Sequence, residues 1–263
     1  MKLYVTLVKG AFMENIVYVF SVFFTLVGNL LYIVLVFFLW KGIYGNEESI
    51  HGMTFNEVFV YLALASSILV LFHNFTDWVM ANQIRDGSII IYLLKPLSYR
   101  TQLMTHALGF ALFNALLITI PSLVVILIVF HSSIPIGFNV VLFPISLACA
   151  FVLSFIFDYM IGLTAFYTES IWGISTAKDV IVALLSGALI PLQFFPDNLQ
   201  HILLLLPFQA IYYIPLHIIT GTGLQWLDYL QLIGTQLFWV GVFIIVSGLF
   251  YRKAIRVLTV NGG

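Results

Sequence analysis

The residues of this chain that could carry chemistry are few, and the clearest lies inside a long apolar run. Asp158 stands between Phe157 and Tyr159. An ionisable side chain in such a run is costly to bury and therefore marks a candidate functional position. It could line a hydrophilic cavity or accept a proton, although we favour a structural pairing with a neighbouring hydroxyl, an amide or Lys178.

A second group of polar residues lies in an earlier apolar run. His73, Asn74 and Asp77 are predicted to form one helical face near the cytoplasmic end of the second span, because residues three and four apart are neighbours on a helix. Near the end of a membrane span, such a face could line the inner vestibule of a transport pathway. Helix capping and solvation at the interface are the alternative explanation.

The other chemistry-bearing residues do not form the pattern of an active site. The single cysteine, Cys149, lies in an apolar run and cannot form an intrachain disulfide. Glu47 and Glu48 are expected in a solvated loop. Four histidines map to one side of the predicted topology, but they lack the spacing of metal ligands and are interpreted as interfacial: His51, His131, His201 and His217.

The sequence contains no phosphate-binding loop of the form Gly-x-x-x-x-Gly-Lys-Ser/Thr. Its glycines are scattered through apolar runs, where they are expected to permit close packing of helices. We therefore predict no nucleotide or metal cofactor in this chain. Any ATP chemistry would come from a partner.

The candidate residues must be positioned by membrane helices. Of the 263 residues, 62% are hydrophobic and 8% are charged, whereas about a quarter of the residues in a soluble domain are charged. A membrane span needs about 20 mostly apolar residues. We predict an all-α polytopic membrane protein with six spans, at residues 20–40, 55–78, 103–130, 140–167, 172–192 and 230–251.

Basic residues predict the orientation of these spans, because Lys and Arg resist translocation across a membrane. Only Lys41 falls on one side, so the other side is predicted to be the cytoplasmic one. The protein is therefore predicted to lie in a bacterial inner membrane with both termini in the cytoplasm. Lys178 interrupts the fifth span and is expected to extend its ammonium to the inner surface. The cytoplasmic set is Lys2, Lys9, Arg85, Lys95, Arg100, Lys178, Arg252, Lys253 and Arg256.

The remaining segments are predicted to belong to one domain of residues 1–263. Residues 1–19 have apolar positions at helical spacing, interrupted by charges, which is typical of a short helix on the inner membrane surface. Residues 194–229 are apolar, but three prolines divide them into pieces too short to cross. We expect short re-entrant helices in the outer leaflet, buried against protein.

The connection at residues 80–101 has the clearest turn signals in the chain. Gly87 suits the left-handed position that follows a helix. Ser88 can cap a new helix. Pro96 ends that helix, because the residue before a proline avoids the helical region. These signals predict a short cytoplasmic helix at residues 89–95.

One face of this short helix is predicted to be apolar, with Ile90, Leu93 and Leu94 on it. A compact helix of this kind can dock in a groove of a cytoplasmic partner and transmit movement to the attached spans. An interfacial helix held on the membrane by basic residues is an equally good interpretation of the residues alone. The basic residues around it are Arg85, Lys95 and Arg100.

In the order and placement of several short motifs, the chain resembles the permeases of type-2 ABC exporters. Each motif is weak by itself, but together they cover essentially the whole predicted topology. The motifs are Ile84-Arg85-Asp86-Gly87, Leu93-Leu94-Lys95-Pro96-Leu97, Ala165-Phe166-Tyr167, Ser186-Gly187-Ala188-Leu189-Ile190-Pro191-Leu192-Gln193-Phe194-Phe195-Pro196, Leu206-Pro207-Phe208 and Tyr213-Ile214-Pro215.

The resemblance implies a permease that forms a homodimer or heterodimer and binds a separate cytoplasmic ATPase on each coupling helix. ATP and Mg²⁺ would be bound by that partner, and the cargo would be an amphiphilic drug, lipid, peptide or glycan. The implied coupling residues are Arg85, Asp86, Gly87, Ile90, Leu93, Leu94, Lys95 and Pro96. The implied outer gate consists of Ser186, Gly187, Pro191, Phe194, Phe195 and Pro196.

Two other classes of membrane protein would leave different patterns in the sequence. An ion-coupled secondary transporter would usually show inverted repeats and paired interrupted helices near mid-membrane. An intramembrane enzyme would need a nucleophile and its base, or acids and histidines, at matching depth. The sequence shows neither pattern.

Overall fold

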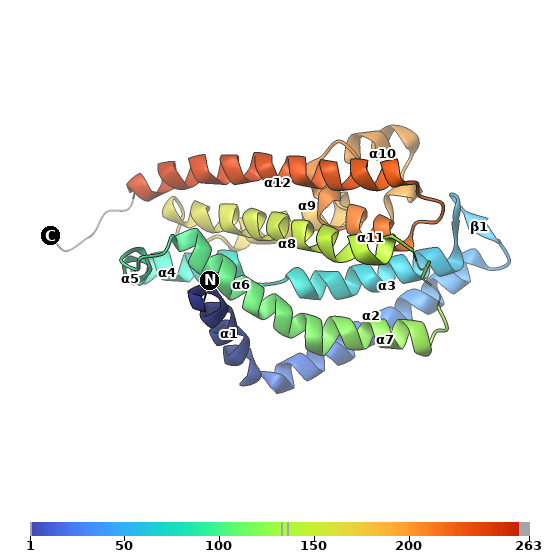
Figure 1. Cartoon of the computed structure of the whole chain (residues 1–263), viewed down its shortest axis with the longest axis horizontal. Helices are drawn as coiled ribbons and strands as arrows, with labels where there is room; N and C mark the ends of the chain where they lie inside the picture. Colours follow the sequence, from blue (N-terminus) through green and yellow to red (C-terminus); the bar gives the residue numbers. More distant parts are fainter. Residues whose placement is uncertain (1, 133, 136, 258–263) are drawn as a thin grey trace.

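The computed structural model describes residues 2–132, 134–135 and 137–257. They form an α-helical protein with one small hairpin at an end of the molecule (Figure 1). In the hairpin, β1 (Ser49–Ile50) pairs antiparallel with β2 (Met53–Thr54). His51 and Gly52 between the strands both have positive φ, which is the turn geometry that suits a two-residue hairpin.

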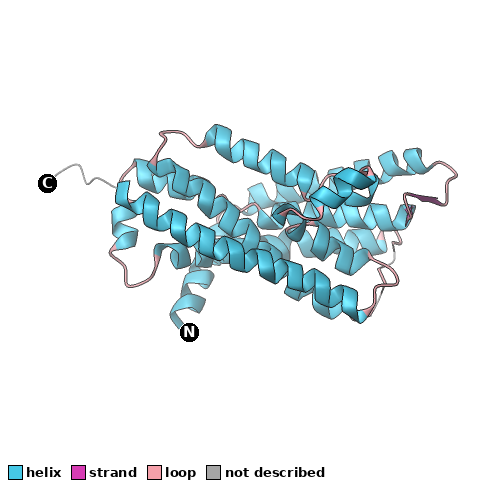
Figure 2. Ribbon diagram, turned by 90° about the horizontal axis from the view of Figure 1, so that it is seen from above, coloured by secondary structure: helices cyan, strands magenta, loops and turns pink. Residues whose placement is uncertain are grey.

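Five helices in the described ranges are long and apolar enough to cross a membrane, and Figure 2 shows long helices aligned with the long axis of the molecule. They are α2 (Val19–Tyr44), α3 with α4 (Phe55–Phe72 and Thr76–Arg85), α6 with η1 and α7 (Tyr99–Asn114, Ala115–Thr119 and Ile120–Ile128), α8 with η2 (Asn139–Leu163 and Thr164–Phe166), and α12 with η5 (Trp226–Ala254 and Ile255–Val257). The predicted fold class is confirmed, and these helices match predicted spans one to four and six.

The fifth predicted span, residues 172–192, contains a shorter helix than expected. α9 (Trp172–Leu185) has 14 residues. At 1.5 Å per residue it extends about 21 Å, less than the hydrocarbon thickness of about 30 Å. The helix ends before Gly187, whose φ of +81° leaves the helical region. Six spans therefore remain a prediction, since five long helices are found in the described part of the chain.

The predicted re-entrant region forms short helices. α10 (Asp197–Leu203), η4 (Pro207–Ala210) and α11 (Tyr213–Thr220) follow one another, and Figure 1 shows them in the half of the molecule that carries the hairpin. α11 is almost fully buried. The predicted boundary at residue 229 is too late, because α12 already begins at Trp226. A re-entrant course through lipid stays a prediction.

The third span contains a wider helical turn. In η1, the Ile120 N–H donates to the Ala115 carbonyl five residues back. Pro121 follows directly, and its ring would crowd a carbonyl four residues back in a regular helix. The π turn relieves that crowding, so α6 and α7 remain one continuous span.

α3 is the central helix of the bundle. In its most apolar window 78% of residues are buried, compared with 17% for α2 and 11% for the C-terminal helix. Nearly every residue from Val58 to Ile68 is covered, whatever its face. A helix that is apolar and buried all round belongs in the interior. α2 and α12 therefore lie at the periphery, with most of their surface not covered by other described parts of the chain.

The N-terminal segment forms α1 (Lys2–Ile16), which packs closely on α6. A Cβ atom at Gly109 would lie 2.6 Å from the Ala11 Cβ atom, so only glycine allows this approach. Phe12 also packs edge to face against Phe113, with 5.3 Å between ring centroids. The predicted helix is present, while its position on the membrane surface stays a prediction, and residue 1 lies outside the described residues.

A buried polar cluster joins three spans near the middle of the bundle. The Asn29 amide on α2 donates to the Ser67 hydroxyl on α3 at 3.2 Å and to the Ser122 hydroxyl on α7 at 2.9 Å. All three side chains are buried. Small polar residues of this kind hold membrane helices together by hydrogen bonds that lipid cannot replace.

We expect Asn29→Ala to lower the free energy of unfolding by about 1 kcal/mol, because two hydrogen bonds between helices are lost. Unfolding in mixed micelles of increasing denaturing detergent measures this change. Thr25→Ala is the matched control, because the Thr25 hydroxyl is exposed and bonds only within its own helix, to the Ser21 carbonyl. Equal stability of Asn29→Ala and the wild-type chain would contradict the role of the cluster.

Candidate functional site

The second span is interrupted, although its sequence contains neither proline nor glycine at that point. α3 ends at Phe72 and α4 begins at Thr76. Phe75 has a φ of +52°, a conformation that a bulky residue rarely adopts. The prediction of one continuous helix over residues 55–78 is therefore wrong here, and His73, Asn74 and Asp77 do not share a helical face.

Asn74 stabilises the interruption through its side-chain amide. Its Nδ2 donates to the Phe72 carbonyl at 3.1 Å, and its Oδ1 accepts from the Thr76 N–H at 3.1 Å. The Thr76 hydroxyl also donates to the same oxygen. Broken helices in a membrane require such partners, because lipid offers no hydrogen bonds to the freed backbone groups.

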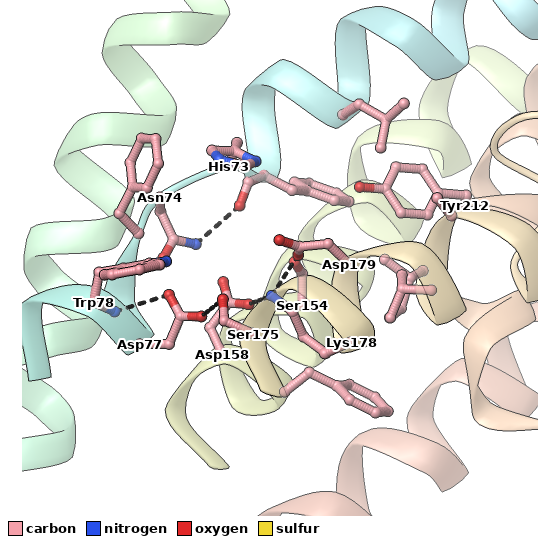
Figure 3. A pocket seen from close by; sticks show the side chains of 17 residues that line it. His73, Asn74, Asp77, Trp78, Ser154, Asp158, Ser175, Lys178, Asp179 and Tyr212 are labelled. Carbon is pink, nitrogen blue, oxygen red and sulfur yellow. Dashed lines mark hydrogen bonds and ion pairs between the residues drawn. The ribbon is translucent and has the colours of Figure 1, made fainter. Parts of the chain in front are cut away.

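The interruption opens into a cavity of about 200 Å³ between α4, α8 and α9 (Figure 3). All four residues predicted for the pathway line it: His73, Asn74, Asp77 and Asp158. Ser175, Lys178 and Asp179 of α9 also line it, together with aromatic side chains that include Trp78 and Tyr212. The fold brings the predicted residues together, while the passage of a substrate along them stays a prediction.

Asp158 is paired with Lys178, as the structural interpretation of its sequence position predicted. The Lys178 ammonium lies 2.5 Å from Asp158 Oδ1 and 2.7 Å from Asp179 Oδ1. Its side chain is only 13% exposed. The expectation that Lys178 extends to the inner surface is therefore wrong, because the buried carboxylate of α8 holds its ammonium within the bundle.

Asp77 belongs to a second contact between helices in the same cavity. The Ser175 hydroxyl donates to Asp77 Oδ2 at 2.5 Å, and the Trp78 N–H donates to Asp77 Oδ1 at 2.9 Å. Asp77 and Ser175 are both buried. The cavity thus contains three carboxylates and one ammonium, and its polar contacts connect α4 with α9 and α9 with α8. No group of residues that could hold a metal is found in the parts of the chain that are described.

The predicted gate residues lie in the outer segment, which we define as residues 186–196. The Tyr61 hydroxyl of α3 donates to the Gly187 carbonyl at 2.9 Å. The Tyr213 N–H donates to the Ser186 carbonyl at 3.0 Å. Phe194 packs edge to face on Trp40 of α2, with 5.0 Å between ring centroids.

The other gate candidates complete the outer segment. Pro191 is buried, and Phe195 is partly buried and packs against the core. Pro196 directly precedes α10. These contacts fix the segment on α2 and α3, in the same half as the hairpin. A role as a gate stays a prediction.

The connection at residues 80–101, which we call the coupling segment, contains α5 (Ile89–Leu93), two residues shorter than predicted. Gly87 has a φ of +76°, which confirms the predicted left-handed turn. The Ser88 side chain forms no cap, and the Ser88 N–H instead donates to Asp86 Oδ1 at 2.8 Å. Hydrogen bonds from the Ser88 side chain and its backbone lower the pKa of Asp86, so the carboxylate that holds the turn is ionised at neutral pH.

The exposed face of α5 differs by one residue from the prediction. Ile91 and Leu94 are 62% and 81% exposed, and Ile90 is also exposed. Leu93 packs against the core, so it does not belong to this face. Ile89 is fully buried and anchors the helix.

Contacts with the start of α6 hold the coupling segment in one arrangement. The Gln102 amide donates to the Tyr92 carbonyl at 2.8 Å, and the Tyr99 hydroxyl donates to Gln83 Oε1 at 2.6 Å. The Lys95 ammonium lies over the Tyr92 ring, 4.4 Å from its centroid. Arg85 is exposed at the end of α4, and Pro96 is exposed after the helix.

We expect Lys178→Met to lower the free energy of unfolding by about 3–5 kcal/mol, because the buried carboxyl group of Asp158 loses the ammonium that pairs it. The double variant with Asp158→Asn should regain most of this loss. Unfolding in mixed micelles measures both, with Lys178→Arg as the control that keeps the charge. If the single and double variants are equally stable, the pair does not stabilise the bundle.

Gly187→Ala should lower the free energy of unfolding by about 1–2 kcal/mol from backbone strain alone. A steric term adds to this, because the new Cβ atom would lie 2.8 Å from the Tyr61 hydroxyl. Gly45→Ala is the matched control, since Gly45 also has a positive φ but open space around it. Tyr61→Phe should reduce the loss at Gly187 and leave the loss at Gly45 unchanged; an equal effect at both sites would contradict the close contact.

Comparison with known families agrees with this architecture. Residues 30–262 match the sequence model of the family described as ABC-2 family transporter protein. No curated protein matches the chain. The match extends from α2 to beyond the end of α12 and so includes the interrupted second span, the coupling segment, the polar cavity and the outer segment. The chain belongs to the ABC-2 family of transporter proteins.

Proposed function

We propose that the chain is the permease subunit of an ATP-driven exporter, and that a cytoplasmic ATPase docks on α5. The observation that carries this proposal is the exposed apolar face of α5. Ile90, Ile91 and Leu94 point away from a helix whose opposite side is anchored by Ile89. A short helix with this pattern suits insertion into a groove of a protein partner.

The rigidity of the coupling segment favours a protein partner over lipid alone. An interfacial helix needs only an apolar face and nearby basic residues. α5 is in addition fixed to α4 through the Asp86 turn and to α6 through Gln102. A partner that pushes on α5 would therefore move the attached spans rather than a loose loop.

A groove beside the coupling segment widens the surface available to such a partner. It has a volume of about 550 Å³ and lies between the end of α4 and the connection from α8 to α9. Arg85 lines one side and Glu169 lines the other, so the groove offers both charges to a complementary surface. ATP and Mg²⁺ are bound by the partner in this proposal, and hydrolysis takes place there.

Two permease chains, identical or related, form the pathway in this proposal. The cargo is an amphiphilic drug, lipid, peptide or glycan. The cavity supports this class of cargo, because it combines charged side chains with aromatic walls next to the lipid-exposed Phe75.

The proposed location is a bacterial inner membrane with both termini in the cytoplasm. The excess of basic residues on one side of the predicted topology favours this orientation. α1, α5 and the C-terminal end of α12 also lie in the same half of the molecule (Figure 1). The hairpin and the outer segment would then face away from the cytoplasm.

Replacing both Ile91 and Leu94 with Asp should reduce co-purification of the ATPase at least about tenfold, because two charges would be placed in an apolar docking groove. ATP-dependent transport should fall in parallel, while membrane insertion stays unchanged. The measurement is affinity purification of the tagged chain, co-expressed with the ATPase from its native host.

Val257→Asp provides the control for added charge, since Val257 is an exposed apolar residue in η5 at the same end of the molecule. It should retain the ATPase. If the double variant on α5 also retains the ATPase and transports normally, α5 is not the docking site.

A further inference from the structure

The interrupted second span cannot transmit movement from α5 to the outer half of the protein as a rigid rod. α5 is joined to the end of α4 by the short turn at Gly87, but α3 lies beyond the break at residues 73–75. A break with one residue in the left-handed region can absorb rotation of α4 without moving α3. Movement that reaches the outer segment therefore needs another route.

α4 is tied to α9 on the cytoplasmic side of that break. The Ser175 hydroxyl donates to the Asp77 carboxylate at 2.5 Å, and the two residues are 2% and 3% exposed. α4 also packs on α8, where Met80 fills the space beside Gly162. That apolar contact is non-directional, whereas a buried hydrogen bond to a carboxylate also fixes the orientation of both partners.

α9 extends from this contact to the outer segment. Ten residues separate Ser175 from Leu185, a rise of about 15 Å along the helix. The helix ends directly at Ser186 and Gly187, whose carbonyls are held by Tyr213 and Tyr61. A shift of α9 along its axis must therefore act on these two contacts.

We infer that Asp77 and Ser175 are positioning residues that transmit movement of α5 through α9 to the outer segment. This inference rests on the proposed function, because the movement begins with ATPase docking on α5. The Lys178–Asp158 ion pair joins α9 to α8, so these two helices are expected to move together. The competing route runs through α3 and the Tyr61 hydroxyl.

The test follows the outer segment in the full complex of permease and ATPase in lipid nanodiscs. Leu189→Cys, in a Cys149→Ala background, places a thiol at a partly exposed position of the outer segment. Its rate of modification by a soluble maleimide is measured with and without a non-hydrolysable ATP analogue. Co-purification of the ATPase is measured on the same samples.

We expect the analogue to change the labelling rate of the parent chain, and Ser175→Ala to reduce that change about fivefold or more. The ATPase should remain bound to Ser175→Ala, because α5 is intact. Thr176→Ala is the matched control, since it removes a hydroxyl from an exposed position of the same helix. It should keep the full response.

Exchanging the two residues of the contact distinguishes transmission of movement from a merely structural role. Asp77→Ser combined with Ser175→Asp restores a hydroxyl and a carboxylate across α4 and α9, and should recover the response that Ser175→Ala loses. A full response in Ser175→Ala, or its loss in Tyr61→Phe instead, overturns this inference alone. Absence of a bound ATPase from the parent chain overturns the proposed function and this inference with it.

Discussion

The lack of water in the membrane interior determines most of what is seen in this structure. Every backbone group that leaves a helix, and every charged side chain, must find its partner within the protein. At residues 73–75 the partner is the Asn74 side chain, and at Gly187 it is the Tyr61 hydroxyl. The irregular parts of the chain are therefore held by side-chain hydrogen bonds, one between α3 and α4 and the other between α3 and the end of α9.

Large parts of the fold could be predicted from the sequence, because lipid imposes a strong and simple pattern. Long apolar runs identified the five long helices, and the basic residues of the connections gave one consistent orientation. Gly87 was predicted correctly because a left-handed turn after a helix favours glycine. The pairing of Asp158 followed from the cost of a buried charge, with Lys178 as one of the partners considered.

The features that were missed depend on contacts between distant residues. The break after Phe72 has no proline or glycine, and Asn74 gave its only local signal. The exposed face of α5 includes Ile91 rather than Leu93, because packing of the coupling segment on α6 decides which side is covered. Asn29 is a neutral residue in an apolar run, so its bonds to Ser67 and Ser122 left no pattern to recognise.

The π turn between α6 and α7 affects how mutations in the third span have to be interpreted. One additional residue in that turn shifts the angular phase of the helix, so positions before Ala115 and after Thr119 follow two different wheels. A single helical wheel drawn over residues 99–128 would assign lipid-facing positions to the interior in one half. Substitutions in this span should therefore be grouped by half before any periodicity is calculated.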